Sequence, residues 1–154
     1  MAVPLIEQVK IQARVLVPLV RALQSELGEA RANALVRKAI GPLFRQYGEA
    51  WWREGAGNFE QVLSTSFRRF AAGEALDYQV VEQTPDSFDV DVTGCRYARF
   101  FQELGEPELG FLLVCSADFA LAEGFEGVEL TRTQTIMQGA DHCDFRFRRK
   151  QTPR

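Results

Sequence analysis

Cysteine and histidine are scarce in this chain, and both are absent from its first 94 residues. The single histidine is His142, and the three cysteines are Cys95, Cys115 and Cys143. Because the number of cysteines is odd, disulfides within the chain cannot pair them all. Side chains that can act as nucleophiles or metal ligands are therefore concentrated in the C-terminal part. This concentration suggests one shared site, either for nucleophilic catalysis or for a metal.

A secretion signal, a membrane span and a basic surface are also missing. The N-terminal run MAVPLIEQVKIQARVLVPLV is interrupted by Glu7, Lys10 and Arg14, so we expect no signal peptide there. No stretch approaches the roughly 18 uninterrupted apolar residues that a membrane helix needs. The formal net charge of -3 argues against general nucleic-acid binding, which needs a basic surface. We therefore expect a cytoplasmic protein whose cysteines are free, catalytic or metal-bound.

The length and composition indicate one globular domain that spans residues 1–154. A chain of 154 residues is typical of a single domain. Hydrophobic residues make up 46% of it, which is enough for a core that needs no disulfide. The sequence shows no internal repeat and no low-complexity stretch. We divide the domain into a helical part, residues 1–72, and an α+β part, residues 73–150.

The helical part shows apolar residues at helical spacing. The spacing predicts one long helix over residues 4–27, which Pro18 should kink or interrupt, and a second over residues 29–52. Two long helices joined at a glycine form an antiparallel hairpin. A third helix is expected over residues 59–72, with Asn58 as its N-cap.

The α+β part begins with alternation of apolar and polar residues. Two alternating runs flank the turn-like cluster TPDS and predict a β-hairpin. Two helices should follow, over residues 96–105 and 106–124, and then two strands over 128–136 and 142–149. The order of helices, hairpin, two helices and hairpin predicts an α+β fold. Its four-stranded sheet should be mostly antiparallel, with two helices between its β-hairpins.

A thiol becomes a useful nucleophile when a cation, a helix terminus or a histidine stabilises its thiolate. The candidates for this role are Arg132, His142 and the start of the helix that follows Cys95. Asp118 comes three residues after Cys115, so it lies on a neighbouring face of the same predicted helix. A helix between two hairpins must pack on the sheet, which could bring the cysteines together.

Two other interpretations of these residues are open. Three thiolates with His142 form an adequate zinc set, namely Cys95, Cys115, Cys143 and His142, although the usual close pair of cysteines is absent. Zinc is therefore possible, and we commit to no cofactor. In the simplest interpretation, Cys115 is a small buried hydrophobe and His142 is a surface residue.

The sequence of the last strand predicts which of its side chains face the core and which face away from it. If Cys143 points inward with the two phenylalanines of CDFRF, the polar residues between them point the other way. Those outward residues are His142, Asp144 and Arg146.

The segment from Val92 to Phe147 resembles the 2-aminothiazoline-4-carboxylate hydrolase family, often called ATC hydrolase-like. The matching positions agree with the family pattern in order and spacing, and they cover about a third of the chain. They are Cys95 and Tyr97, the run ELGEPELG over residues 103–110, Cys115 and Asp118, Arg132, Thr133 and Thr135, and residues 139–146.

The resemblance implies a hydrolase that acts on a small molecule. It would open a carbon–nitrogen bond of a cyclic amidine, such as 2-aminothiazoline-4-carboxylate, to give a carbamoyl-cysteine. The family fold also resembles the vinyl-reductase type of small-ligand-binding domain, many members of which catalyse nothing. The alternative is therefore a non-catalytic module that binds a small ligand or a metal, because a shared fold does not establish a shared function.

Under the hydrolase interpretation, the matched residues take these roles. Cys115 or Cys95, with Cys143 as a further candidate, would attack the amidine carbon. Asp118 would hold the amidinium, and His142 or Asp144 would move protons. Arg132 would anchor the substrate carboxylate. The remaining substrate-binding candidates are Tyr97, Thr133, Thr135 and Asp144. Hydroxide on zinc is the alternative nucleophile.

The first two helices also suggest self-association. Their apolar faces are wider than one small sheet needs to cover. We therefore predict that two copies can form a homodimer through the N-terminal helices.

Overall fold

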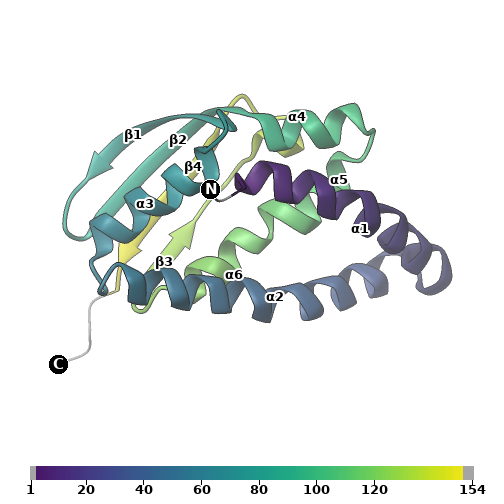
Figure 1. Ribbon diagram of the computed structural model, residues 1–154, viewed down its shortest axis with the longest axis horizontal. Coiled ribbons are helices and arrows are strands. Elements are labelled where there is room, and N and C mark those ends of the chain that lie inside the picture. Colours follow the sequence, from purple (N-terminus) through teal and green to yellow (C-terminus); the bar gives the residue numbers. More distant parts are fainter. Residues whose placement is uncertain (1–2, 151–154) are drawn as a thin grey trace.

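Two long helices and a shorter one form the N-terminal half of the protein, as the periodicity predicts (Figure 1). The computed structural model describes residues 3–150, and in it these helices are α1 (Leu5–Leu27), α2 (Glu29–Glu54) and α3 (Phe59–Ala71). α1 continues through Pro18, so an interruption there is wrong. Asn58 caps α3 as predicted, because its side chain accepts a hydrogen bond from the Gln61 N–H at 3.0 Å.

Four antiparallel strands form the sheet, which confirms the α+β fold class. They are β1 (Leu76–Gln83), β2 (Ser87–Cys95), β3 (Val128–Thr131) and β4 (Cys143–Arg149). Their spatial order is β1-β2-β4-β3, so the two predicted hairpins join through β2 and β4 at the centre. This arrangement places the C-terminal end of β2 beside the start of β4, where Val92 pairs with Cys143.

β3 ends at Thr131, five residues before the predicted end at residue 136. The backbone N–H groups of Thr133 and Gln134 do not continue the ladder, because both donate to the Asp144 carboxylate at 2.8 and 3.0 Å. The chain then forms a short 3₁₀ turn, η2 (Ile136–Gln138), whose N-cap is Thr135. A carboxylate on the neighbouring strand therefore replaces the last sheet bonds of β3.

The segment between the two hairpins is helical, but its second helix is divided. After α4 (Arg96–Glu103) come α5 (Pro107–Gly110), a π-helical turn η1 (Phe111–Cys115) and α6 (Ala117–Glu123). The π turn is closed by the Ser116 N–H, which donates to the Phe111 carbonyl at 2.8 Å. π turns are rare and are often found at functional sites. This one lies directly before Asp118 and contains Cys115.

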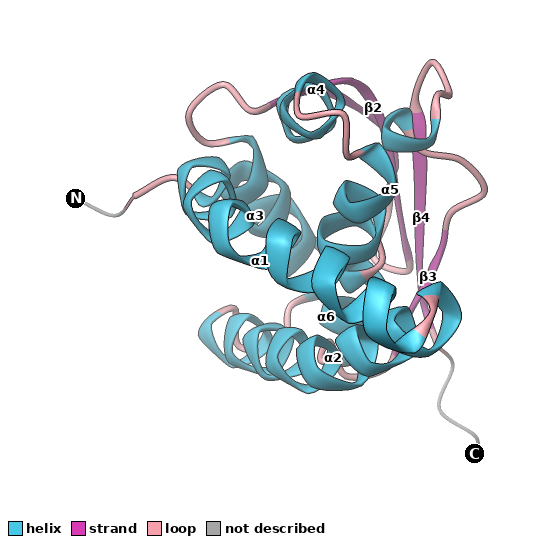
Figure 2. Ribbon diagram, turned by 90° about the vertical axis from the view of Figure 1, so that its right-hand side faces the viewer, coloured by secondary structure: helices cyan, strands magenta, loops and turns pink. Residues whose placement is uncertain are grey.

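The helices lie on one side of the sheet (Figure 2). α3 contributes Leu63 and Phe67 to a buried core with the β2 side chains Phe88, Val90 and Val92. The opposite face of the sheet carries charge instead. Arg146 pairs with Asp91 at 2.9 Å, and Arg148 pairs with Asp89. The apolar face of the sheet is therefore the one that the helices cover.

Within residues 3–150, none of the helices combines the length and the apolar character that crossing a membrane requires.

The contact of α2 with α6 depends on two glycines. A Cβ atom added at Gly48 would overlap the Leu121 carbonyl oxygen, and one added at Gly124 would overlap the Arg45 carbonyl oxygen. The two helices therefore touch through their backbones at this point. Because α6 carries Asp118, the close crossing also sets the position of that carboxylate.

We expect Gly48→Ala to lower the free energy of unfolding by about 1–3 kcal/mol, because the added methyl forces the two backbones apart. Gly41 is the matched control: it lies in the same helix, and a Cβ there meets nothing within 4 Å. Gly41→Ala should be neutral or stabilising by up to about 1 kcal/mol. Urea unfolding of both variants checks this. Equal effects at the two positions would contradict the proposed close crossing.

The possible homodimer stays a prediction. α1 and α2 expose large apolar side chains, namely Ile11, Val15, Leu19, Leu35, Leu43 and Tyr47. If this surface joins two copies, the protein sediments as a dimer at micromolar concentration. Val15→Glu should then give a monomer, because it places a charge in an apolar contact. The matched control is Val81→Glu on β1, at another exposed valine. Sedimentation of the wild type as a monomer would refute the dimer.

Candidate functional site

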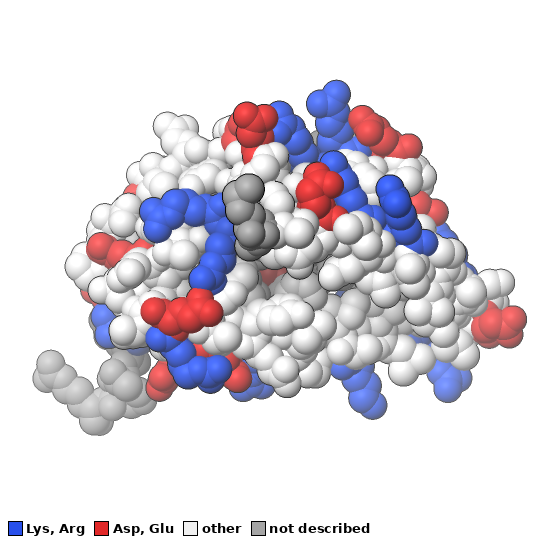
Figure 3. Space-filling view, viewed as in Figure 1, with Lys and Arg blue, Asp and Glu red and all other residues white. Residues whose placement is uncertain are grey.

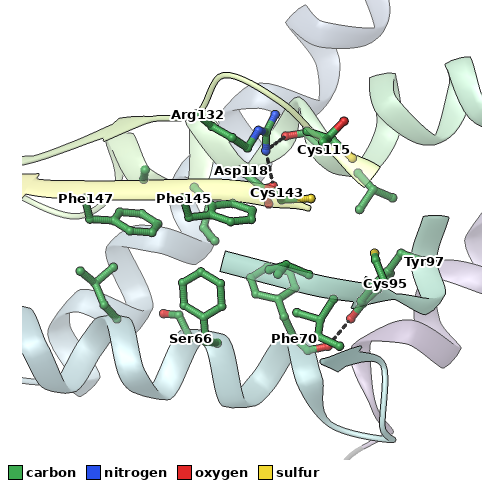
Figure 4. Close-up of a pocket in the computed structure, with 18 of the residues that line it drawn as sticks. Ser66, Phe70, Cys95, Tyr97, Cys115, Asp118, Arg132, Cys143, Phe145 and Phe147 are labelled. Carbon is green, nitrogen blue, oxygen red and sulfur yellow. Dashed lines mark hydrogen bonds and ion pairs between the residues drawn. The ribbon is translucent and has the colours of Figure 1, made fainter. Parts of the chain in front are cut away.

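A small cavity lies between α3, the sheet and the η1–α6 segment (Figure 4). Its volume is about 80 Å³, roughly five times what one water requires. Most of the wall is apolar. The polar and reactive side chains in the wall are Ser66, Cys95, Tyr97, Cys115, Asp118, Arg132, Thr135 and Cys143. We call this space the thiol cavity. It brings together seven of the site residues that the sequence suggested.

The three cysteines reach the thiol cavity from three different elements (Figure 4). Cys95 ends β2 and caps α4, where its sulfur accepts a hydrogen bond from the Ala98 N–H at 3.4 Å. Cys143 begins β4, and its sulfur accepts from the Ile136 N–H at 3.2 Å. Cys115 ends the π turn. All three are free thiols.

Burial dominates the protonation of these thiols. It raises the pKa of Cys95 to about 11, although the Ala98 N–H opposes the change. Burial also raises the pKa of Cys115 well above its usual value. The pKa of Cys143 is raised by burial too, while the Ile136 N–H and the charge of Arg132 lower it. Of the stabilising groups that the sequence suggested, the start of α4 acts on Cys95 and Arg132 acts on Cys115 and Cys143, but burial outweighs them.

Asp118 and Arg132 form a partly buried ion pair at the edge of the cavity, with 21% of the Asp118 side chain exposed. Arg132 Nη1 donates to Asp118 Oδ2 at 2.8 Å and to the Cys115 carbonyl at 3.1 Å. Only 3% of the Arg132 side chain is exposed. Its guanidinium also lies 4.9 Å from the ring centroid of Phe119 and 5.4 Å from that of Phe145. The pair joins α6 to the segment after β3 and fixes the charged end of the cavity.

The pair keeps unused binding capacity. Within residues 3–150, the guanidinium nitrogens Nε and Nη2 of Arg132 donate no hydrogen bond, and Asp118 Oδ1 accepts none. Burial raises the pKa of Asp118 to about 6, against the opposing effect of Arg132. The ion pair therefore keeps guanidinium donors and a carboxylate acceptor that no described residue uses. Its carboxyl group also titrates close to neutral pH.

Tyr97 and Thr135 line the cavity but are engaged with the protein. The Tyr97 hydroxyl donates to the Phe70 carbonyl at 2.8 Å, and burial raises the pKa of that hydroxyl. Thr135 donates to Gln138 Oε1 at 3.0 Å and accepts from the Gln138 N–H at 3.2 Å. Both residues hold the wall in place. Their predicted role in substrate binding stays a prediction.

Three suggested residues do not line the thiol cavity: Thr133, His142 and Asp144. His142 is partly exposed and contacts Asp141 and Gln134 on the outer side of the turn. Burial acts to raise the pKa of Asp144, but hydrogen bonds from Thr133 and Gln134 outweigh it and lower that pKa. Asp144 thus braces the end of β3, and the predicted role of His142 and Asp144 in proton transfer stays a prediction.

The possible zinc set is not assembled. Across the described range, 3–150, no group of three or more His, Cys, Asp and Glu side chains is placed to hold a metal ion. His142 does not line the cavity that holds the three cysteines. The donor geometry therefore does not fit the four-coordinate site that zinc prefers.

The α3 wall is the part of the site that sequence reasoning missed. Leu63, Ser66, Phe67 and Phe70 all line the thiol cavity. They recur at helical spacing on the inward face of α3. The only signal in the sequence was that apolar face, which a plain core helix shows equally.

Comparison with known families agrees with this geometry. The model of the L-2-amino-thiazoline-4-carboxylic acid hydrolase family matches residues 8–147. The chain belongs to this family. The match confirms the resemblance seen in the sequence and extends it into α1 and α2, where no motif was recognised. The family name supports a hydrolase-like function. A search of the curated proteins found no match.

The raised pKa of Asp118 has a consequence for stability. The folded protein holds this proton to about pH 6, whereas an unfolded aspartate releases it near its usual value of 3.8. Protonated Asp118 therefore stabilises the fold at low pH. This contribution to the free energy of unfolding is lost as the pH rises from 3.8 to about 6. Relative to Asp118→Asn, the wild type should lose on the order of 2 kcal/mol of unfolding free energy over this interval.

Urea unfolding of both proteins from about pH 4 to about pH 7 measures this difference. Groups that the two proteins share cancel in the subtraction. Parallel stability curves would show that Asp118 titrates normally and would contradict the assigned pKa.

Proposed function

We propose that this protein is a hydrolase that opens a cyclic amidine by attack of a cysteine thiol, and that its substrate also carries a carboxylate. One observation carries the proposal: three thiols, a carboxylate and a guanidinium line the same small cavity. Membership of the ATC hydrolase family supports the reaction class. The substrate would be 2-aminothiazoline-4-carboxylate or a molecule of the same chemistry.

Opposite charges bind the two ends of such a substrate. The amidinium donates to Asp118, which has an oxygen that no described residue engages. The substrate carboxylate accepts from the guanidinium nitrogens of Arg132 that the ion pair leaves unused. Because Arg132 is almost completely buried, these charge-assisted hydrogen bonds form in a low dielectric, where they are strong.

Cys143 is the nucleophile that we propose. It combines two features that stabilise a thiolate, the Ile136 N–H at 3.2 Å and the nearby charge of Arg132. A bound amidinium adds a further positive charge to the cavity, which lowers the thiol pKa at the moment of reaction. The sequence alone favoured Cys115 or Cys95. Cys115 has no backbone N–H donor to its sulfur among the hydrogen bonds of residues 3–150.

The proposed reaction has two steps, attack by the thiolate and then hydrolysis. The thiolate sulfur bonds to the amidine carbon, the ring carbon–nitrogen bond breaks, and the ring nitrogen leaves as an amine with the thiol proton. Water then adds to the same carbon, and the bond to the cysteine sulfur breaks. The carbamoyl product departs, and the thiol regains a proton. Asp118, whose pKa is raised to about 6, is the titratable side chain that can transfer these protons.

A second candidate function is ligand binding without turnover. It is favoured by the raised pKa of all three thiols, because a protonated thiol is a poor nucleophile. Under this alternative the cavity binds the same kind of charged small molecule, and no covalent bond forms.

Cys143→Ser should lower kcat with 2-aminothiazoline-4-carboxylate by at least about a thousandfold, because the hydroxyl is a far weaker nucleophile. Product formation is followed by chromatography of the carbamoyl product. Cys95→Ser and Cys115→Ser are the matched controls, with the same replacement in the same cavity, and each should stay within about tenfold of wild type.

Mass spectrometry of the protein quenched during turnover should show an adduct on Cys143. A large loss confined to Cys115→Ser would transfer the nucleophile role to Cys115. Tight binding of the amidine without any product would leave ligand binding as the function.

A further inference from the structure

We propose that the natural substrate carries an apolar substituent, and that this substituent binds in a groove between α1 and α2 beside the thiol cavity. The inference rests on the proposed function, since it assumes that the polar head of the substrate occupies the thiol cavity. It adds a second binding compartment and a substrate class, which is a cationic head joined to an apolar chain or ring.

The groove lies between the two long helices and has a volume of about 230 Å³. Among its described lining residues, α1 and α2 contribute one polar side chain, Gln12, and otherwise apolar ones, including Leu16, Leu43 and Phe44. Figure 3 shows mainly uncharged surface over this part of the molecule, with a hollow near its centre. Asp118 and Tyr97 are the polar side chains on its inner wall, and over the rest of the groove a hydrocarbon group would lose contact with water.

The groove and the thiol cavity share a wall. Four residues line both spaces: Phe70, Tyr97, Val114 and Asp118. The hydrogen bond from Tyr97 to the Phe70 carbonyl, at 2.8 Å, holds part of this wall. The Asp118 carboxylate is thus at the junction. In the proposed complex, a cation paired with Asp118 extends its remaining atoms past this wall and into the groove.

The relative sizes of the two spaces indicate a two-part ligand. The groove, at about 230 Å³, is nearly three times as large as the thiol cavity, at about 80 Å³. A small ring with an amidine fits the thiol cavity and leaves the groove empty. An apolar substituent fills it, and each buried methylene should tighten binding about fourfold.

The experiment uses linear alkylamidines, from acetamidine to hexanamidine, as probes with the full-length protein. Their dissociation constants are measured by calorimetry or by ligand-observed NMR. We expect affinity to rise about fourfold for each added methylene. An affinity that does not depend on chain length would overturn the inference.

Two matched variants test whether the alkyl chain of the probe lies in the groove. Gln12→Trp places a large ring in the groove and should reduce the affinity for hexanamidine to that for acetamidine, with acetamidine itself unchanged. Gln46→Trp makes the same replacement at an exposed position of α2 that does not line the groove, and it should leave the whole series unchanged. Equal effects of the two variants would also overturn the inference.

Asp118→Asn separates this inference from the proposed function. If the head pairs with Asp118, which lines both spaces, the variant weakens every probe by the same factor and keeps the dependence on chain length. A chain-length dependence that survives without any effect of Asp118→Asn supports the groove and overturns the pairing of the head with Asp118. Turnover through Cys143 with no chain-length dependence supports the proposed function and overturns the groove.

Discussion

The ion pair between Asp118 and Arg132 is the interaction on which the functional half of this protein depends. It joins α6 to the segment that leaves β3, and it lies on the wall of the thiol cavity. Removing two charges from water is costly, and the Coulomb attraction offsets that cost only with good geometry and further hydrogen bonds. Here the Cys115 carbonyl accepts one further hydrogen bond from Arg132 and two aromatic rings lie against its guanidinium, yet burial still raises the pKa of Asp118 to about 6. The cavity and the local fold therefore both depend on the Asp118–Arg132 ion pair.

The same burial acts on the chemistry in two opposed ways. It raises the pKa of all three thiols, which keeps them protonated and inert in the free protein. It also strengthens every charge interaction that a bound ligand makes in the cavity. Under the proposed function, the amidinium of the substrate lowers the pKa of the thiol that it meets, so that reactivity follows binding.

Periodicity predicted the elements because it reports which residues face a core. It predicted α3, its Asn58 cap and the parity of β4, in which Cys143 and Phe147 are buried. It could not predict where β3 ends, because a side chain on another strand, Asp144, takes the backbone N–H groups. The concentration of cysteines in the C-terminal part suggested one shared site, and Cys95, Cys115 and Cys143 line one cavity. Partners distant in sequence, such as Asp118 and Arg132, depend on tertiary packing and were not paired.

The alternation along β4 ties the two faces of the sheet to each other. Cys143 and Phe147 point toward the helices, while Arg146 and Arg148 reach the carboxylates of β2 on the other side. A one-residue slip in the pairing register of this strand would exchange the two sets, with guanidinium groups on the helix-covered face and the thiol on the other. The strand is therefore expected to tolerate a change of length at its ends better than within it.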